Sequence, residues 1–266
     1  MPRPSSNPFT PNQPVNEEER FFGREDVIEW IDDCFIEGQR FLLIYGTPRV
    51  GKTSLLYRLR PKLAAKALAV YIDLEALAEA PLRELLWRLV AEAHRQISQG
   101  REGIPDLSPE AFHSQRDYLH RQVFPLWRQM LRGKYLLLLL DGPDLACFQE
   151  GAWAELVLRL QEIVEQEELY VVATVRGTSA QARQPVPALR GLPRWDLDCL
   201  TEMQTEELLV GVARYQLGFD YDALRRVHSL TGGHPYLVQV FGAQLYRHLA
   251  PYGQVTIHSV SDLAQV

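Results

Sequence analysis

The chain has 266 residues, enough for one large domain or for one domain with a small satellite. Its apolar fraction of 46% and charged fraction of 23% are typical of a soluble globular protein. No apolar run approaches the roughly 18 residues that span a bilayer, and the net charge of −6 argues against a generally basic, nucleic-acid-coating surface.

Three cysteines, Cys34, Cys147 and Cys199, are scattered without metal-like spacing. The N-terminus lacks the charged and then apolar layout of a secretory signal. Both observations predict a reduced, cytoplasmic setting. Several arginines cluster between residues 176 and 194, and this stretch is either a local basic patch or a solvated loop.

The first part of the chain alternates between predicted strands and predicted helices. Residues 1–20, rich in Pro, Asn and Ser, predict an extended arm. Short apolar runs predict buried strands over 41–45, 67–73, 135–141, 169–174 and 195–200. Apolar residues at helical spacing predict helices over 24–37, 53–59, 82–97, 109–131 and 153–165. This alternation predicts an α/β fold with a parallel five-stranded sheet and helices on both of its faces.

After residue 200 the pattern predicts helices only, over about 203–217, 220–229 and 236–249. The change predicts a boundary between an α/β core at 21–200 and a small all-helical lid domain at 201–253. Residues 254–266 predict a strand and the opening of a helix, as at the start of a truncated or vestigial winged-helix-like segment.

A glycine-rich loop follows the first predicted strand. Its sequence, Gly46-Thr-Pro-Arg-Val-Gly51-Lys52-Thr53, matches G-x-x-x-x-G-K-[ST] at every fixed position. Glycines let backbone N–H groups approach phosphate oxygens, and the following helix adds the positive end of its dipole. We therefore expect the loop to bind ATP or ADP, with Lys52 reaching the β- and γ-phosphates of ATP and the Thr53 hydroxyl binding Mg²⁺. The residues expected to contact the nucleotide are Gly46, Thr47, Pro48, Arg49, Val50, Gly51, Lys52, Thr53 and Ser54.

A magnesium-bound triphosphate also needs a carboxylate at the end of a neighbouring strand. Asp141 directly follows the apolar run Leu136–Leu140, and we expect it to bind Mg²⁺. It lies far enough downstream of Lys52 to leave room for another strand between the two elements.

The residues after Asp141 depart from the usual pattern of such ATPases. A glutamate normally follows the aspartate and orients or deprotonates the attacking water. Here the chain continues Gly142-Pro143-Asp144, and Gly142 can accept no proton. Asp144 either substitutes for the glutamate or caps the following helix. We expect slow hydrolysis or none.

The segment Phe21-Phe-Gly-Arg-Glu25 resembles the Phe-x-Gly-Arg-Glu box of AAA+ and STAND-type ATPases (signal-transduction ATPases with numerous domains). In those families the box lies beside the adenine, so the resemblance implies this position for Phe22, Gly23 and Arg24. The alternative for Arg24 is a surface ion pair with a neighbouring acidic residue.

Two later motifs resemble the same group. Ala173-Thr-Val-Arg176 resembles the hydrophobic-Thr-x-Arg sensor motif, which implies that Arg176 reads the γ-phosphate. Thr231-Gly-Gly-His-Pro235 resembles the Gly-x-Pro turn that closes a helical lid, which implies nucleotide contacts for His234 and Pro235. The alternatives are an ordinary loop arginine and a helix-entry histidine.

The resemblance covers roughly residues 15–265 and is closest to the AAA-like ATPase domains of bacterial and archaeal multidomain signalling proteins. It implies an AAA+-like P-loop NTPase core with a helical lid. Three functions remain open: a nucleotide-dependent switch, an active AAA+ ATPase coupled to DNA or a protein complex as in origin initiators, and a scaffold with permanently bound nucleotide. The expected partners are nucleotide and a protein partner or a second copy of the chain; the sequence indicates no membrane and neither supports nor excludes nucleic acid.

Overall fold

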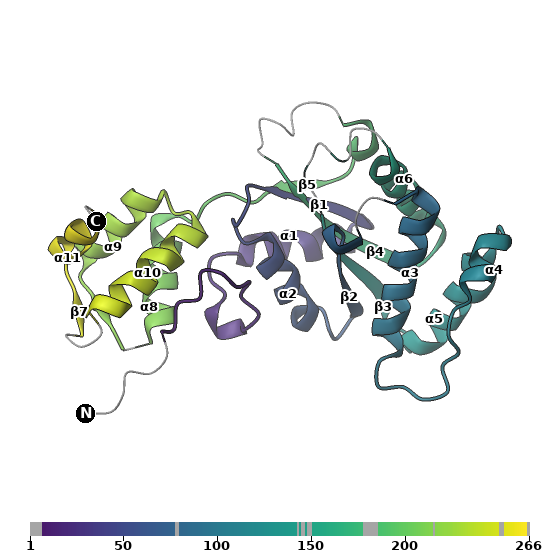
Figure 1. Ribbon diagram of the computed structural model, residues 1–266, viewed down its shortest axis with the longest axis horizontal. Helices are drawn as coiled ribbons and strands as arrows, with labels where there is room; N and C mark the ends of the chain where they lie inside the picture. Colours follow the sequence, from purple (N-terminus) through teal and green to yellow (C-terminus); the bar gives the residue numbers. More distant parts are fainter. Residues whose placement is uncertain are drawn as a thin grey trace. The chain divides into compact units, whose positions relative to one another are not determined.

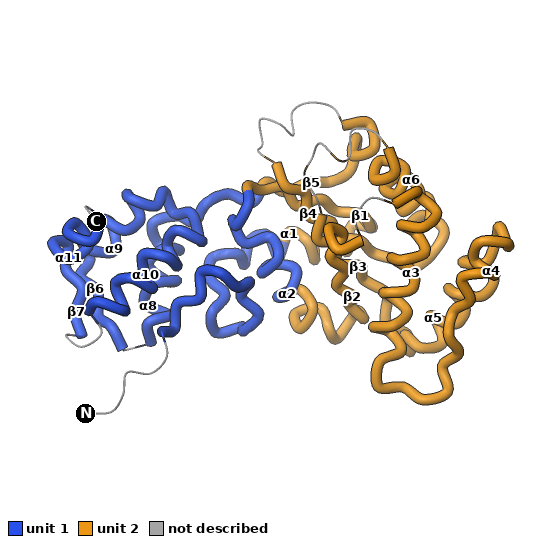
Figure 2. The backbone as a smooth tube through the Cα atoms, viewed as in Figure 1, with its two compact units in different colours: residues 1–29, 48–58, 197–266 blue, residues 30–47, 59–196 orange. Residues whose placement is uncertain are grey.

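The computed structural model describes residues 7–77, 80–142, 144, 147, 151–177, 186–214, 216–249 and 253–264 (Figure 1). The chain divides into two compact units, drawn in blue and orange in Figure 2. Unit 1 comprises residues 1–29, 48–58 and 197–266, and unit 2 comprises residues 30–47 and 59–196. Part of the arginine-rich stretch, residues 178–185, lies outside the described residues, as does Pro143.

A five-stranded parallel sheet forms the centre of unit 2. Its strands are β1 (Phe41–Gly46), β2 (Ala67–Asp73), β3 (Tyr135–Asp141), β4 (Leu169–Arg176) and β5 (Arg194–Asp196). They lie in the order β2-β3-β4-β1-β5. This arrangement confirms the predicted fold class, and β4 is the strand expected between β1 and β3. The fourth strand continues to Arg176, and the fifth is shorter than predicted.

Helices cover both faces of this sheet, which explains why its strands are nearly continuous apolar runs. The side chains of Leu43, Leu138 and Val171 face one core, which they share with α3 (Leu82–Ser98), α5 (Phe124–Leu131) and α6 (Ala152–Gln166). On the opposite face, Phe35 near the end of α1 (Glu25–Ile36) makes edge-on ring contacts with Tyr135 and Tyr170. Alternate residues of each strand therefore serve two separate apolar layers.

The predicted single helix over 109–131 is wrong. The chain forms α4 (Pro109–Ser114), a π-helical turn over Leu119–Val123 and then α5. Pro125 lies in the first turn of α5 and has no N–H to donate to the residue four positions earlier. The N–H of Phe124 donates instead to the carbonyl of Leu119, which is the wider π-type spacing.

The helical part of unit 1 consists of α8 (Glu202–Ala213), α9 (Tyr221–Thr231), α10 (Pro235–Leu249) and α11 (Ile257–Leu263). The expectation of helices alone after residue 200 is wrong in one respect, because β6 (Gly218–Phe219) pairs in parallel with β7 (Gln254–Val255). No helix in the described part of the chain is long and apolar enough to cross a bilayer.

The N-terminal arm is packed rather than free over residues 7–10. Phe9 is only 3% exposed and lies against α10, where a Cβ on Gly242 would come within 2.4 Å of its ring. Asn7 Nδ2 donates to the carbonyl of Ala243 at 2.9 Å, and the N–H of Thr10 donates to Gln239 Oε1 at 3.2 Å. A glycine on α10 therefore provides the space that the arm occupies.

His94 is a buried, fully hydrogen-bonded histidine in the core of unit 2. The indole N–H of Trp127 donates to His94 Nδ1 at 3.1 Å, so Nε2 carries the proton and donates to the carbonyl of Pro105 at 3.1 Å. Burial lowers the pKa of His94. A second proton on the ring would have to displace the Trp127 donor.

We expect His94 to make the free energy of unfolding depend on pH. Its folded pKa lies below the unfolded value of about 6.5, so its contribution is complete above about pH 6.5 and is lost as the pH falls through the folded pKa. Urea unfolding followed by tryptophan fluorescence from pH 8 to pH 5 would measure this. As the pH falls, His94→Gln should lose less free energy of unfolding than the wild type does. The exposed control His258→Gln should lose as much as the wild type. Equal pH dependence in all three proteins would contradict this assignment.

Candidate nucleotide-binding site

The carboxyl ends of the parallel strands in unit 2 bring several polar residues to one edge of the sheet. β1 ends at Gly46, β2 at Asp73, β3 at Asp141 and β4 at Arg176. The register pairs Gly46 with Arg176 and Asp73 with Asp141. Ligands of open α/β sheets bind at this edge, because the loops diverge there and leave room.

The Asp141 carboxylate is held by side chains from both neighbouring strands. Thr174 Oγ1 on β4 donates to Oδ1 at 2.7 Å, and the Tyr71 hydroxyl on β2 donates to Oδ2 at 3.0 Å. Thr174 is fully buried and also accepts the N–H of Gly142 at 3.0 Å. The carboxylate therefore has one fixed orientation, as a metal-binding carboxylate requires.

Arg176 has two acidic partners within unit 2. It forms an ion pair with Glu75, which opens the short helix η2 (Glu75–Leu77), and its Nε lies 3.7 Å from Asp144 Oδ1. All three side chains are at least 36% exposed. The arginine predicted to read a γ-phosphate is therefore bound to carboxylates in this structure.

Asp144 does not cap α6, the next helix for which the structure describes an N-cap. The helix α6 begins at Ala152, and its N-cap is Gly151. Asp144 instead pairs with Arg176 through both its side chain and a parallel backbone bridge.

The phosphate loop runs from the end of β1 to the start of α2 (Lys52–Lys62). Gly46 and Thr47 belong to unit 2, and the loop from Pro48 onward belongs to unit 1. Arg49 and Gly51 have left-handed backbone conformations, with φ of 62° and 107°. No described atom lies within 4 Å of the position of a Cβ on Gly51. Such turns point successive N–H groups to one side and form an anion-binding nest, so the loop fits a polyphosphate.

The other loop residues differ in exposure. Val50 and Lys52 are buried, at 1% and 7% exposed, whereas Thr53 is half-buried. The hydroxyl of Ser54 accepts the N–H of Val15 at 3.0 Å. The hydroxyl of Ser54 thus anchors the N-terminal arm, and its expected nucleotide contact stays a prediction.

Magnesium would need oxygen ligands beyond the protein carboxylates. Among the described residues, no group of three or more His, Cys, Asp and Glu side chains could hold a metal ion. Thr53 belongs to unit 1 and Asp141 to unit 2, so their joint role as Mg²⁺ ligands stays a prediction. One hydroxyl and one oriented carboxylate fit this ion, which commonly completes its octahedron with phosphate and water oxygens.

The Phe-Gly-Arg box of the N-terminal segment is buried within unit 1. Arg24 is 8% exposed and donates to the carbonyls of Val50 at 3.1 Å and Asp198 at 2.7 Å. Burial lowers its pKa. The alternative of a surface ion pair for Arg24 is therefore wrong. Its side chain links the phosphate loop to the segment after β5.

Phe22 and Gly23 pack on α8. A Cβ on Gly211 would come within 2.3 Å of the Phe22 ring, and a Cβ on Gly23 would come within 2.7 Å of the Gln204 side chain. Gly23 also has a φ of 69°. The close packing explains both glycines without a ligand, and the adenine-side position of the box stays a prediction.

The Gly-Gly-His-Pro turn at the start of α10 contacts the phosphate loop within unit 1. His234 Nε2 donates to the carbonyl of Pro48 at 3.2 Å, and Nδ1 is buried without a hydrogen-bond partner among the described residues. Pro235 is the first residue of α10, as suits a residue without an N–H. Gly233 is required by space, since a Cβ there would lie 2.0 Å from the carbonyl oxygen of Leu200.

The guanidinium of Arg49 lies 4.3 Å from the centre of the Tyr236 ring. This cation–π contact stabilises the arginine in its left-handed conformation, which otherwise costs a non-glycine residue about 1–2 kcal/mol. Arg49 thus has a partner on α10, and Pro48 has one in the turn directly before that helix.

Four residues of the site had no assigned role in the sequence: Tyr71, Glu75, Thr174 and Tyr236. Strand register offers the clearest guide to two of them. Thr174 lies on β4 beside Asp141 on β3, and Tyr71 lies two positions before the end of β2. Glu75 and Tyr236 depend on how the loop after β2 and the first turn of α10 fold, which strand alignment does not show.

Solved structures share this fold at low sequence identity. The RuvB Holliday junction branch migration motor of Thermotoga maritima has a TM-score of 0.58 and 14% identity, and the match covers 94% of this chain and 71% of that chain. A Walker-type ATPase of Pyrococcus abyssi has a TM-score of 0.65 and 18% identity, over 90% of this chain and 71% of that chain. The Orc1 protein of Aeropyrum pernix, in a complex with DNA, has a TM-score of 0.54 and 14% identity, over 91% and 64%. No protein-family model and no curated protein matches the sequence. The chain therefore has the fold of AAA+-type P-loop ATPases.

Proposed function

We propose that the protein binds ATP or ADP with Mg²⁺ and acts in the cytoplasm as a nucleotide-dependent switch of the STAND type, with slow hydrolysis or none. The observation that carries this proposal is the direct contact, within unit 1, between the phosphate loop and the first turn of α10. His234 bonds to Pro48, and Tyr236 stacks with Arg49. The expected readout is engagement of a protein partner or self-association.

Phosphate binding is the first step of this function. The nest formed around Arg49 and Gly51 would present backbone N–H groups to the phosphates. Lys52 would add a compact positive charge, while Thr53 and Asp141 would hold the metal. Mg²⁺, when bound, would neutralise phosphate charge and fix the geometry of the triphosphate.

The switch follows from the shared position of Pro48 and Arg49. Both residues belong to the loop proposed to bind phosphate. Pro48 contacts His234 directly before α10 and Arg49 contacts Tyr236 on α10, so a change in loop conformation would have to be accommodated there. A switch requires that two states of the protein bind nucleotide with different affinity. A tenfold difference corresponds to about 1.4 kcal/mol, comparable to the contribution of one hydrogen bond or one cation–π contact.

Slow hydrolysis follows from the acidic residues at the sheet edge. Gly142 provides no base, and Asp144 and Glu75 both pair with Arg176. Asp141 would thus remain oriented for metal binding, while neither Gly142 nor Asp144, the described residues nearest after it, offers an unpaired carboxylate to activate water.

An active DNA-handling ATPase is the second candidate. The fold is shared with the RuvB branch migration motor and with Orc1 bound to DNA. The net charge of −6 opposes this candidate. DNA-stimulated turnover with salt-dependent binding would favour it over the switch.

Lys52→Ala should weaken the binding of MgATP and MgADP by at least about tenfold, because it removes a charged donor to the phosphates. Isothermal titration calorimetry would measure the dissociation constants. The matched control is Lys62→Ala, an exposed lysine in the last turn of the same helix. Nucleotide binding that is unchanged in Lys52→Ala would contradict a phosphate-binding loop.

Gly142→Glu should raise the rate of ATP hydrolysis, whereas Gly142→Gln should not, since glutamine has the size of glutamate but accepts no proton. The wild type should turn over well below about 1 per second. A steady-state phosphate-release assay compares the three proteins. Wild-type turnover comparable to that of vigorous ATPases would rule out the slow switch.

Replacing His234 and Tyr236 together by alanine should uncouple nucleotide state from α10 while the protein still binds nucleotide. In the wild type, hydrogen exchange in the first turn of α10 should differ between the ADP and ATP forms, and in this variant the difference should disappear. His248→Ala, at the exposed far end of α10, is the control and should behave as the wild type. If apo, ADP and ATP forms of the wild type show identical exchange, oligomeric state and partner affinity, the switch proposal fails.

A further inference from the structure

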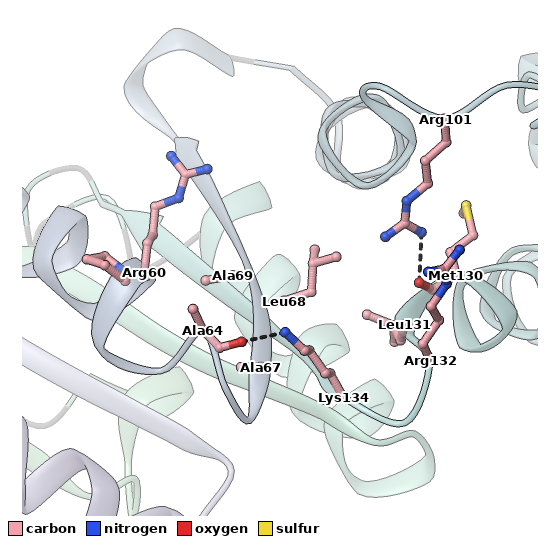
Figure 3. Close-up of a pocket in the computed structure, with 11 residues that line it drawn as sticks. Arg60, Ala64, Ala67, Leu68, Ala69, Arg101, Met130, Leu131, Arg132 and Lys134 are labelled. Atoms are coloured by element: carbon pink, nitrogen blue, oxygen red, sulfur yellow. Dashed lines mark hydrogen bonds between the residues drawn. The ribbon is translucent and has the colours of Figure 1, made fainter.

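A pocket of about 590 Å³ lies in unit 2 at the amino ends of β2 and β3, at the opposite end of these strands from Asp141 (Figure 3). Its volume is within the range of about 300–1,000 Å³ that small-ligand sites occupy. The lining residues are Arg60, Pro61, Ala64, Ala67, Leu68, Ala69, Arg101, Met130, Leu131, Arg132 and Lys134.

The pocket gathers positive charge without any acidic side chain in its lining. Arg60, Arg101, Arg132 and Lys134 come from three separate segments of the chain, because Arg132 and Lys134 share the loop between α5 and β3. None of the four forms an ion pair with a carboxylate in the described part of the protein, whereas other cations of unit 2 do, such as Lys66 with Asp32 and Arg128 with Glu167. In a chain of net charge −6, this grouping attracts an anion.

Two of the cations also have a structural role, which does not neutralise them. Arg101 Nη1 donates to the carbonyl of Met130 at 2.7 Å, and Lys134 Nζ donates to the carbonyl of Ala64 at 2.5 Å. Both acceptors lie near helix ends, where carbonyls lack partners within the helix. A carbonyl carries only a partial charge, and each cation keeps further N–H donors for a ligand.

The side chains of the other two cations are exposed and make no hydrogen bond to a described residue. Arg60 lies in the last turn of α2, and Arg132 caps α5 in a left-handed conformation with a φ of 52°. Glycine or asparagine usually occupies such a position, so an arginine there is held at a cost in free energy. In Figure 3, Arg60 lies on one side of the pocket and Arg101 and Arg132 on the other.

The space between these cations is apolar. Leu68 and Ala69 of β2 and Met130 and Leu131 of α5 line it, together with two further alanines. Figure 3 shows Leu68 between Arg60 and Met130. A fully hydrated inorganic ion would gain nothing from this surface, whereas a ligand with an apolar body would cover it.

We propose that this pocket binds a small organic anion, with phosphate or carboxylate groups paired to the cations and an apolar body lying against Leu68 and Met130. Guanidinium groups bind both kinds of oxyanion in bidentate geometry. The site is separate from the phosphate loop and does not depend on the function proposed for it.

Anilinonaphthalene sulfonate is a suitable probe, because it joins one anionic group to a flat apolar body. Its fluorescence would be titrated against the folded, full-length protein in saturating MgADP, so that the nucleotide site is occupied. Replacing Arg60 and Arg132 together by glutamine should weaken probe binding by about tenfold, as expected for the loss of charged donors. The matched control replaces Arg116 and Arg121, which are exposed in unit 2 away from the pocket, by glutamine.

Saturable binding by the wild type and control, with the expected loss in the double variant, would support the proposal. Absence of saturable binding by the wild type would overturn it, as would equal affinity in the double variant and the control. Thermal unfolding of all three proteins shows whether they are equally folded. If the double variant is less stable, Arg60→Gln alone should still weaken binding, and unchanged affinity in that folded variant would also overturn the proposal.

Discussion

The parallel register of the strands in unit 2 is the constraint on which the rest of the site depends. It places the last residues of β1, β2, β3 and β4 at one edge and brings Thr174 beside Asp141. Helices on both faces support this register, because nearly all residues of the central strands β1, β3 and β4 are buried. A slip of one residue would move Asp141 and Thr174 to opposite faces and remove the hydrogen bond between them.

Much of the fold was predictable because its elements have strong local patterns. The apolar runs that end at Gly46 and Asp141 have the length and composition of buried strands, and the glycine-rich loop indicates the order of strand, loop and helix. The break in the helix predicted over 109–131 was harder to predict from the sequence. Its apolar spacing continues through Pro125, and the π-helical turn depends on a missing N–H rather than on hydrophobicity.

The candidate site was predictable to the extent that chemistry requires given residue types. Lys52 and Asp141 follow from the needs of a magnesium-bound triphosphate. The surroundings of these residues did not follow, because they depend on contacts between segments distant in sequence. Arg24 illustrates this, since its two carbonyl acceptors, on Val50 and Asp198, come from different parts of the chain and only the folded unit brings them together.

The pairing of Arg176 with Glu75 and Asp144 has a consequence for how a switch would distinguish ATP from ADP. Ion pairs between exposed side chains contribute only about 0–1 kcal/mol, because water competes for both partners. A γ-phosphate carries more negative charge than either carboxylate and binds a guanidinium in bidentate geometry, so it would displace them at low cost. ADP has no γ-phosphate and would leave these ion pairs in place. A switch needs two alternative sets of partners of similar free energy. An arginine that kept the same partners in every state would respond to neither nucleotide.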